Sequence, residues 1–212
     1  MVSRTSAERE SKQGLHATKE ELIRTLVAML DEQTLDDITS EKVLAISGVS
    51  RGSLYHHFED FAELQELAQV RRFSNYVTHS IAVLTEVFSE VDSREALIAR
   101  CAVAARDLQA PQLSQVRMER MTAISKVMNN PRMAKALGNE QERLTETIAD
   151  LYEGMQLRDY GNPLLEPRTA AVLFQAYALG RTIDDFTPHH MDPENWLYAV
   201  TEIIENIFFP AK

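Results

Sequence analysis

The stretch Gly48–Phe58 has the sequence GVSRGSLYHHF and brings hydroxyl, guanidinium and imidazole groups together. Two adjacent histidines suggest a metal site or acid–base chemistry, whereas a serine-capped helix with a polar outer face suggests docking against phosphates. Successive residues of a helix diverge by about 100°. His56 and His57 therefore cannot both chelate one ion, because a helical pair of ligands needs i, i+4 spacing. The histidine pair is not expected to hold a metal.

Three short helices are predicted to position this stretch. Thr18–Glu21 is a capping box, a threonine followed three residues later by glutamate, and apolar residues at helical spacing come after it. Thr39 or Ser40 caps a second helix, which is predicted to end at Gly48. Ser50 caps the third helix. The second and third helices, joined by a tight turn that contains glycine, form a helix-turn-helix unit.

The phase of the third helix predicts which of its faces is exposed. Leu54 and Phe58 share one side, with Val49 close by, and are expected to face the other two helices. His57 lies nearer this core, and solvation of the helix end is the alternative role for it. The outward residues are Arg51, Gly52, Ser53, Tyr55 and His56. Hydroxyls, a guanidinium fork and a glycine that permits close approach suit a groove floor with phosphate walls, and the helix N-terminus adds free N–H groups.

The longer stretch Thr39–Phe58, TSEKVLAISGVSRGSLYHHF, resembles the DNA-binding signature of TetR-family transcriptional regulators. In that family a threonine cap, an A-G-V-S turn and an L-Y-x-H-F helix recur. The resemblance extends in register to the first helix and to the helix that opens after Phe58. It implies a homodimeric repressor that binds a double-stranded DNA operator, a pseudo-palindrome, and that carries a variable ligand-binding domain.

The resemblance also implies roles for single residues. Thr39 and Ser50 are expected to hold phosphates through hydroxyls and helix-end N–H groups. Tyr55 and His56 are expected to hold the backbone or a base edge, whereas the segment 51–53 faces bases. The DNA-binding residues implied are Thr39, Ser40, Ser50, Arg51, Gly52, Ser53, Tyr55 and His56.

Two departures from the family pattern bear on affinity. Ser47 stands where the family usually has alanine, which is a small-for-small change. Phe61 stands where the family usually has a phosphate-gripping lysine, and Glu59 and Asp60 precede it. The full charges within 39–58 are Glu41, Lys42 and Arg51. Non-specific affinity for DNA is therefore expected to be weak, leaving a larger share to groove contacts.

The bulk properties of the chain are compatible with this prediction. The 212 residues suffice for one medium domain, or for a small domain fused to a larger one. Cys101 is the single cysteine, so no intrachain disulfide forms and a cytoplasmic setting is expected. No signal peptide is recognisable, and no apolar run approaches the roughly 20 residues of a membrane span. The net charge of −10 argues against bulk electrostatic binding of nucleic acid but not against a local DNA-binding face.

Helical patterning continues to the end of the chain. Asp60–Glu63 is a second capping box that opens a long helix, and Asn130-Pro131 and Asp192-Pro193 each combine a cap with proline at the first helical position. The predicted fold class is all-α, with about nine helices. The predicted organisation is a mobile N-terminal arm over 1–14, a helix-turn-helix domain over 15–62, and a larger ligand-binding and dimerisation domain over 63–212.

The larger domain carries no catalytic signature: it has no nucleotide-binding glycine loop, no HExxH and no nucleophile elbow. His189 and His190 with Asp192 could bind a metal, but a capped loop is the simpler interpretation. Cys101 is expected to be a small core residue, with redox sensing as the alternative. No enzymatic activity, metal or cofactor is predicted.

Methionines concentrate on consecutive predicted helices around residues 118–133. Because methionine adapts to irregular shapes, such a cluster is typical either of an apolar ligand pocket or of ordinary core filling. The pocket itself is implied by the family resemblance, and its effector is expected to be apolar or amphipathic. The candidate pocket residues are Arg106, Arg117, Met118, Met121, Met128, Tyr152 and Tyr177.

The last two predicted helices favour dimerisation. The penultimate one is rich in alanine, and the last has a broad apolar stripe that includes Ile203 and Ile207. Two such helices from each subunit can form a four-helix bundle, although burial within one subunit is the alternative. A helix-turn-helix reader needs two half-sites, which favours a homodimer.

These patterns together predict a ligand-responsive transcriptional regulator, a repressor that a small molecule releases from its operator. The alternative is an all-α ligand-sensing or partner-binding module whose operator binding is weak or lost.

Overall fold

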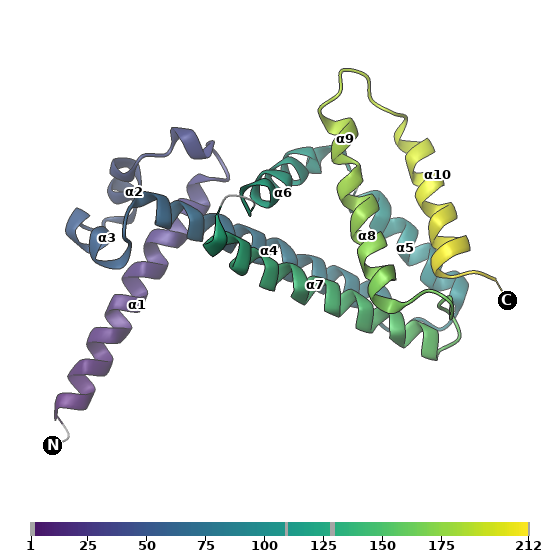
Figure 1. The fold of residues 1–212 in the computed structure, drawn as a ribbon, viewed down its shortest axis with the longest axis horizontal. Coiled ribbons are helices and arrows are strands. Elements are labelled where there is room, and N and C mark those ends of the chain that lie inside the picture. Colours follow the sequence, from purple (N-terminus) through teal and green to yellow (C-terminus); the bar gives the residue numbers. More distant parts are fainter. Residues whose placement is uncertain (1–2, 109, 128–129, 212) are drawn as a thin grey trace. The chain divides into compact units, whose positions relative to one another are not determined.

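The computed structural model describes residues 3–108, 110–127 and 130–211, and these residues form helices and connecting loops without a strand (Figure 1). The all-α fold class is confirmed. The chain divides into two compact units, Met1–Ser74 and Asn75–Lys212. The long helix α4 (Phe61–Phe88) contributes to both.

The first unit contains α1 (Ser3–Met29), the single turn η1 (Leu35–Asp37), α2 (Ser40–Ser47), α3 (Arg51–His57) and the first half of α4. Its core is apolar and fully buried. Leu22 and Leu26 from α1 pack with Val43 of α2, Leu54 of α3 and Leu64 of α4. Each helix thus buries one stripe, as the three-to-four spacing predicts.

Helix α1 starts much earlier than predicted. It begins at Ser3, so the segment predicted as a mobile arm over 1–14 is helical from its third residue. Half of that segment consists of strong helix formers (alanine, glutamate, arginine, lysine and glutamine), and it lacks proline. The capping box predicted at Thr18 is wrong for the same reason. The Glu21 carboxylate instead accepts hydrogen bonds from Arg24, one turn later in the helix.

The second unit comprises the rest of α4 and the elements that follow it. These are α5 (Arg94–Leu108), η2 (Pro111–Leu113), α6 (Ser114–Val127), α7 (Pro131–Leu157), α8 (Pro167–Gly180), α9 (Thr182–Asp185), α10 (Pro193–Ile203) and the π turn η3 (Ile204–Phe208). The two predicted cap-proline starts are confirmed. The side chain of Asn130 accepts from the N–H of Met133, and that of Asp192 from the N–H of Glu194.

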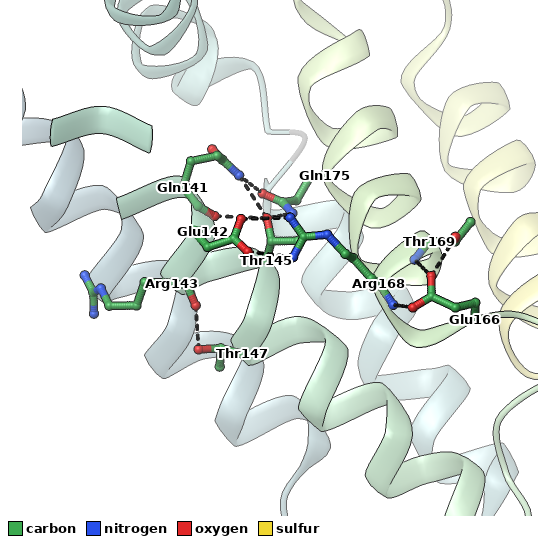
Figure 2. Close-up of polar contacts among 9 residues, drawn as sticks. All are labelled: Gln141, Glu142, Arg143, Thr145, Thr147, Glu166, Arg168, Thr169 and Gln175. Carbon is green, nitrogen blue, oxygen red and sulfur yellow. Dashed lines mark hydrogen bonds and ion pairs between the residues drawn. The ribbon is translucent and has the colours of Figure 1, made fainter. Parts of the chain in front are cut away.

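Polar contacts join α7 to α8 (Figure 2). Arg168 donates twice to the Glu142 carboxylate, at 2.7 and 2.8 Å. On the same pair of helices, Gln141 donates to Gln175, and both amides donate to the hydroxyl of Thr145.

Aromatic packing joins α7 and α8 to the C-terminal turn. Phe174 of α8 stacks on Phe208 of η3 with ring centroids 4.1 Å apart. Tyr152 of α7 donates its hydroxyl to the Phe208 carbonyl at 2.9 Å. The C-terminal turn is therefore part of the core of the unit. No helix within the described ranges is long and apolar enough to cross a bilayer.

Candidate nucleic-acid interface

The turn between α2 and α3 is built by three local devices. Gly48 ends α2 in the left-handed region, at φ 68°, where a side chain would be strained. Thr39 caps α2 by accepting from the N–H of Lys42 at 3.4 Å, and Ser50 caps α3 by accepting from the N–H of Ser53 at 3.2 Å. The predicted start and end of α2 and start of α3 are confirmed.

These capping hydroxyls keep the capacity to donate. A serine or threonine hydroxyl has one O–H donor besides its acceptor lone pairs. Thr39 and Ser50 can therefore hold their helix ends and donate to a phosphate at the same time. Ser40, the first residue of α2, lies beside Thr39.

The two faces of α3 differ as predicted. Leu54 is fully buried and Phe58, directly after the helix, is 2% exposed. Val49 packs against the same core from the turn. The opposite face is exposed at Arg51, Gly52, Tyr55 and His56, with Ser53 half-buried.

Gly52 lies in open space. A Cβ built on its backbone meets no atom within 4 Å, and the residue is not in the left-handed region. Neither packing nor backbone strain thus requires glycine here, although glycine costs helix stability. A close approach from outside the chain is a physical reason for it.

The cations near this face have partners within the chain. Arg51 lies 3.7 Å from the Glu41 carboxylate, and both side chains are well exposed. Hydrogen bonds from nearby backbone and hydroxyl groups, together with the Arg51 charge, lower the pKa of Glu41, which keeps it ionised. Lys42 donates to the Asp37 carbonyl at 2.7 Å. The interface therefore offers few unpaired positive charges.

The two histidines lie in different environments. His56 is exposed, whereas His57 is half-buried, with its ring edge-on to Phe58. Burial, and then the nearby His56 and Lys19, lower the pKa of His57, and its Nε2 is buried without a hydrogen-bond partner. His57 is therefore neutral near pH 7 and serves packing. Within the described residues, no three metal-binding side chains come together.

The start of α4 shows what Phe61 does at the position where the resembled family usually has lysine. The Asp60 carboxylate accepts from the N–H of Glu63 at 2.8 Å, and the Glu63 carboxylate accepts from the N–H of Glu59 at 2.6 Å. This is the capping box predicted there. Phe61 packs against the apolar core of the first unit, so this position stabilises the fold where the family usually grips phosphate.

Comparisons with known proteins bear on the whole chain. No family model matches it. The nucleoid occlusion factors SlmA of Shewanella pealeana and Shewanella halifaxensis are 29% and 30% identical to it over 138 and 134 residues, or 65% and 63% of this chain. The match spans only 61% and 59% of the length of those relatives.

Solved structures match nearly end to end. A TetR transcriptional regulator from Chloroflexus aurantiacus has a TM-score of 0.65 and 17% identity, covering 94% of this chain and all of that one (100%). The reduced form of Escherichia coli NemR has a TM-score of 0.64 and 19% identity, covering 92% of this chain and 100% of that one. The chain has the TetR-family fold.

The residues predicted to line a ligand pocket lie in different environments, and their pocket role stays a prediction. Met118 and Met121 are 40% and 39% exposed, and Arg106 lies on the surface, 3.8 Å from Glu194. Tyr152 is bound to the C-terminal turn. Tyr177 packs against Phe174, and burial raises the pKa of its phenol. Met128 lies outside the described residues.

Of the predicted pocket residues, Arg117 lines a cavity in the described part of the second unit. This cavity is about 40 Å³ in volume, and its walls are Tyr76, Leu108, Leu113, Val116, Arg117, Arg120, Ala178 and Leu179. The sequence analysis missed Tyr76 and Arg120. Their only sequence signal is a polar group at helical spacing among apolar residues, which many surface positions share.

Cys101 is buried in α5, and burial raises the pKa of its thiol to about 12. The thiol is therefore protonated at neutral pH and has little of the thiolate character that redox sensing needs. This environment favours the predicted core role of Cys101 over the redox alternative.

Proposed function

We propose that this protein is a ligand-responsive transcriptional regulator that binds operator DNA through the outer face of α3. The observation that supports this most directly is the division of α3 into a fully packed inner face and an open outer face around Gly52. The second helix of a helix-turn-helix lies in the major groove. The TetR-family fold supports this use of the motif here.

The proposed contacts fall into two groups. Phosphates are bound by hydroxyls and helix-end N–H groups at Thr39, Ser40 and Ser50, and by Tyr55 and His56, whose side chains are exposed. Bases are read from the segment 51–53, where Gly52 lets the helix backbone approach the groove floor. Phosphate contacts fix register, and base contacts give sequence preference.

A homodimer is the proposed assembly, because apolar side chains remain exposed on the C-terminal helices. Ala170 and Ala171 are buried within the subunit, as are Val200 and Phe208. The exposed apolar residues are Val172, Leu173, Tyr198, Ile203 and Ile207. A second copy that covers them would present two reading heads to a pseudo-palindromic operator.

Charge reversal on this surface tests the dimer. Ile203→Glu combined with Ile207→Glu is expected to give a chain that sediments as a monomer, because four buried carboxylates would face each other across the two-fold axis. Leu164→Glu, on a loop residue that is 93% exposed, is the matched control and should sediment as the wild type. A double variant that remains a stable dimer would contradict the proposed interface.

Selection of genomic DNA fragments by the purified protein at physiological salt tests DNA binding. A regulator should enrich a small set of fragments that share a pseudo-palindrome, and Tyr55→Phe should recover less of the same set. Recovery of no fragment above a scrambled-duplex background would favour the alternative, a ligand-sensing module without an operator. For a repressor, the enriched sites should overlap promoters, and an apolar or amphipathic effector should release them.

A further inference from the structure

Arg120 of α6 is a buried arginine with neutral partners only. Only 9% of the Arg120 surface is exposed to solvent. Nη1 donates to the Tyr76 hydroxyl at 2.8 Å, and the guanidinium lies 4.6 Å from the centre of the Tyr76 ring. Nη2 reaches Gln141 Oε1 at 3.4 Å, and Nε has no hydrogen-bond partner. Within the described part of the chain no carboxylate pairs with it, although a buried charge normally requires a counter-charge.

The neutral partner Gln141 is held in place by its own neighbours. Its Nε2 donates to Gln175 Oε1 and to Thr145 Oγ1, as Figure 2 shows on α7 and α8. The amide oxygen is therefore left to face Arg120. Gln141 and Tyr76 together orient the guanidinium without neutralising it.

Arg117, one turn earlier on α6, is a buried arginine whose charge is paired with a carboxylate. Its Nε and Nη2 bind both oxygens of Asp185, at 2.6 and 2.7 Å. Its Nη1 donates to the carbonyls of Leu108 and Ala110. The corresponding Nε–Nη2 edge of Arg120 has no such carboxylate, only the long contact to Gln141.

Both arginines line the 40 Å³ cavity described above. Apart from Tyr76 and the two arginines, its walls are leucine, valine and alanine side chains. The volume is far below the roughly 300 Å³ of a site for a drug-sized ligand, but it admits a small charged head group. The Arg117 charge is already matched by Asp185, which leaves the Arg120 charge to attract an anion.

We propose that this cavity binds a small monocarboxylate with an apolar body. The carboxylate accepts two hydrogen bonds from Nε and Nη2 of Arg120, as Asp185 does from Arg117, and the apolar body lies against Leu113, Val116 and Leu179. Bidentate binding of this kind is the strongest recognition that an arginine offers to a carboxylate. The assignment of this acid as the effector rests on the proposed function, but the site itself does not.

Calorimetric titration of the full chain without DNA tests the site, with hexanoate, hexanol and hexylamine as probes. Hexanoate is expected to bind roughly ten- to a hundredfold more tightly than hexanol, the factor that charge-assisted hydrogen bonds supply. Hexylamine should bind more weakly than either, because its charge repels the guanidinium. Equal binding of hexanoate and hexanol, or no binding of hexanoate, would overturn the proposal.

Two variants locate the effect. Arg120→Met should abolish the preference for hexanoate over hexanol, whereas Arg143→Met, on an arginine of α7 paired with Glu140, should keep it. A preference that survives in Arg120→Met would assign the acid to another site. If Arg120→Met fails to fold, Arg120→Lys is the second variant, because it keeps the charge but loses the bidentate guanidinium. It should reduce the preference for hexanoate over hexanol.

The outcomes separate this inference from the proposed function. If hexanoate binds through Arg120 but the protein enriches no genomic fragment, the carboxylate site is supported and the proposed regulatory function is contradicted. Operator binding, in a protein that treats hexanoate and hexanol alike, would do the reverse.

Discussion

Replacing Gly52 by alanine is expected to stabilise the protein and to weaken its DNA binding, two effects of opposite sign from one methyl group. The added Cβ meets no atom of the chain within 4 Å, and the backbone there needs no glycine. Glycine inside a helix costs about 0.5–1 kcal/mol relative to alanine. Gly52 is the second residue of α3, so the lower end of this range applies. A gain of this size raises the melting temperature of a chain this long by roughly 1–2 °C.

DNA binding should respond in the other direction, because the methyl group would hold α3 away from the groove floor. Loss of one hydrogen bond to a charged phosphate alone corresponds to about 1.5–3 kcal/mol. The affinity for a selected operator should then fall by roughly ten- to a hundredfold. Fluorescence anisotropy with labelled operator measures this change, and thermal unfolding of the same preparation measures the stability.

Gly138→Ala is the matched control. Gly138 is an exposed glycine inside α7, and a Cβ there also meets no atom within 4 Å. This variant should gain at least as much stability, because Gly138 lies well inside its helix, and should leave operator affinity unchanged. If Gly52→Ala also bound the operator as the wild type does, the backbone of α3 would not approach DNA, and the reason given for glycine at this position would be wrong.

Three further changes probe charges and hydroxyls in the chain. Glu41→Gln should tighten DNA binding at low salt, because it removes a carboxylate 3.7 Å from Arg51; titrations at several salt concentrations measure the gain, and unchanged affinity would show that this pair lies outside the interface. Tyr55→Phe should weaken binding to operator and to scrambled duplex equally, by a binding free energy of about 1.5–3 kcal/mol. A loss of affinity confined to the operator would instead indicate that Tyr55 contacts a base. Asp185→Asn should cost about 3–5 kcal/mol of stability in denaturant titrations, because it leaves Arg117 buried without its partner. The Arg117 hydrogen bonds hold the pKa of Asp185 below its usual value. The stability that the ion pair contributes is therefore present above pH about 4 and is lost as the pH falls through the lowered folded-state pKa. An Asp185→Asn variant that is as stable as the wild type at neutral pH, and as sensitive to acid, would contradict this role of the pair.

The helix-turn-helix unit could be predicted from the sequence because its determinants are local. A cap and the N–H that it binds are three residues apart, as in Ser50 with Ser53 and Asp60 with Glu63. The C-terminal glycine of α2 acts through its own backbone angles. Such signals survive without knowledge of the tertiary structure.

The N-terminal helix shows where local signals compete. Thr18–Glu21 has the residue types of a capping box, but helix formers continue upstream of it and the helix runs through. Because residue 18 lies inside the helix, the N–H groups of this turn already bind carbonyls of the preceding turn and need no cap. Glu21 can then pair with Arg24. A capping pattern therefore predicts a helix start only where the preceding residues disfavour helix.

The helices of the second unit could be predicted from the sequence, but the side chains that come together from different helices could not. Arg117 and Asp185 are 68 residues apart, and Arg120 and Tyr76 are 44 apart. Helical spacing says which side of its own helix a residue occupies and nothing about the helix that faces it. The methionines illustrate this limit, because Met118 and Met121 share α6 with both arginines and yet remain partly exposed.

The distribution of arginine explains how a chain with a net charge of −10 can combine the two roles proposed for it. Near α3 the guanidinium of Arg51 is shared with Glu41, and Phe61 strengthens the core where a lysine would bind phosphate. The proposed DNA interface therefore relies on hydroxyls, N–H groups and close backbone approach, which are short-ranged and sensitive to geometry. In the second unit the situation is reversed, because Arg120 is a full charge held by neutral oxygens. If the two proposals hold, a DNA-binding helix with little long-range attraction would be released by small changes in its placement, and a buried charge without a carboxylate partner would give an acidic ligand the free energy to cause such a change.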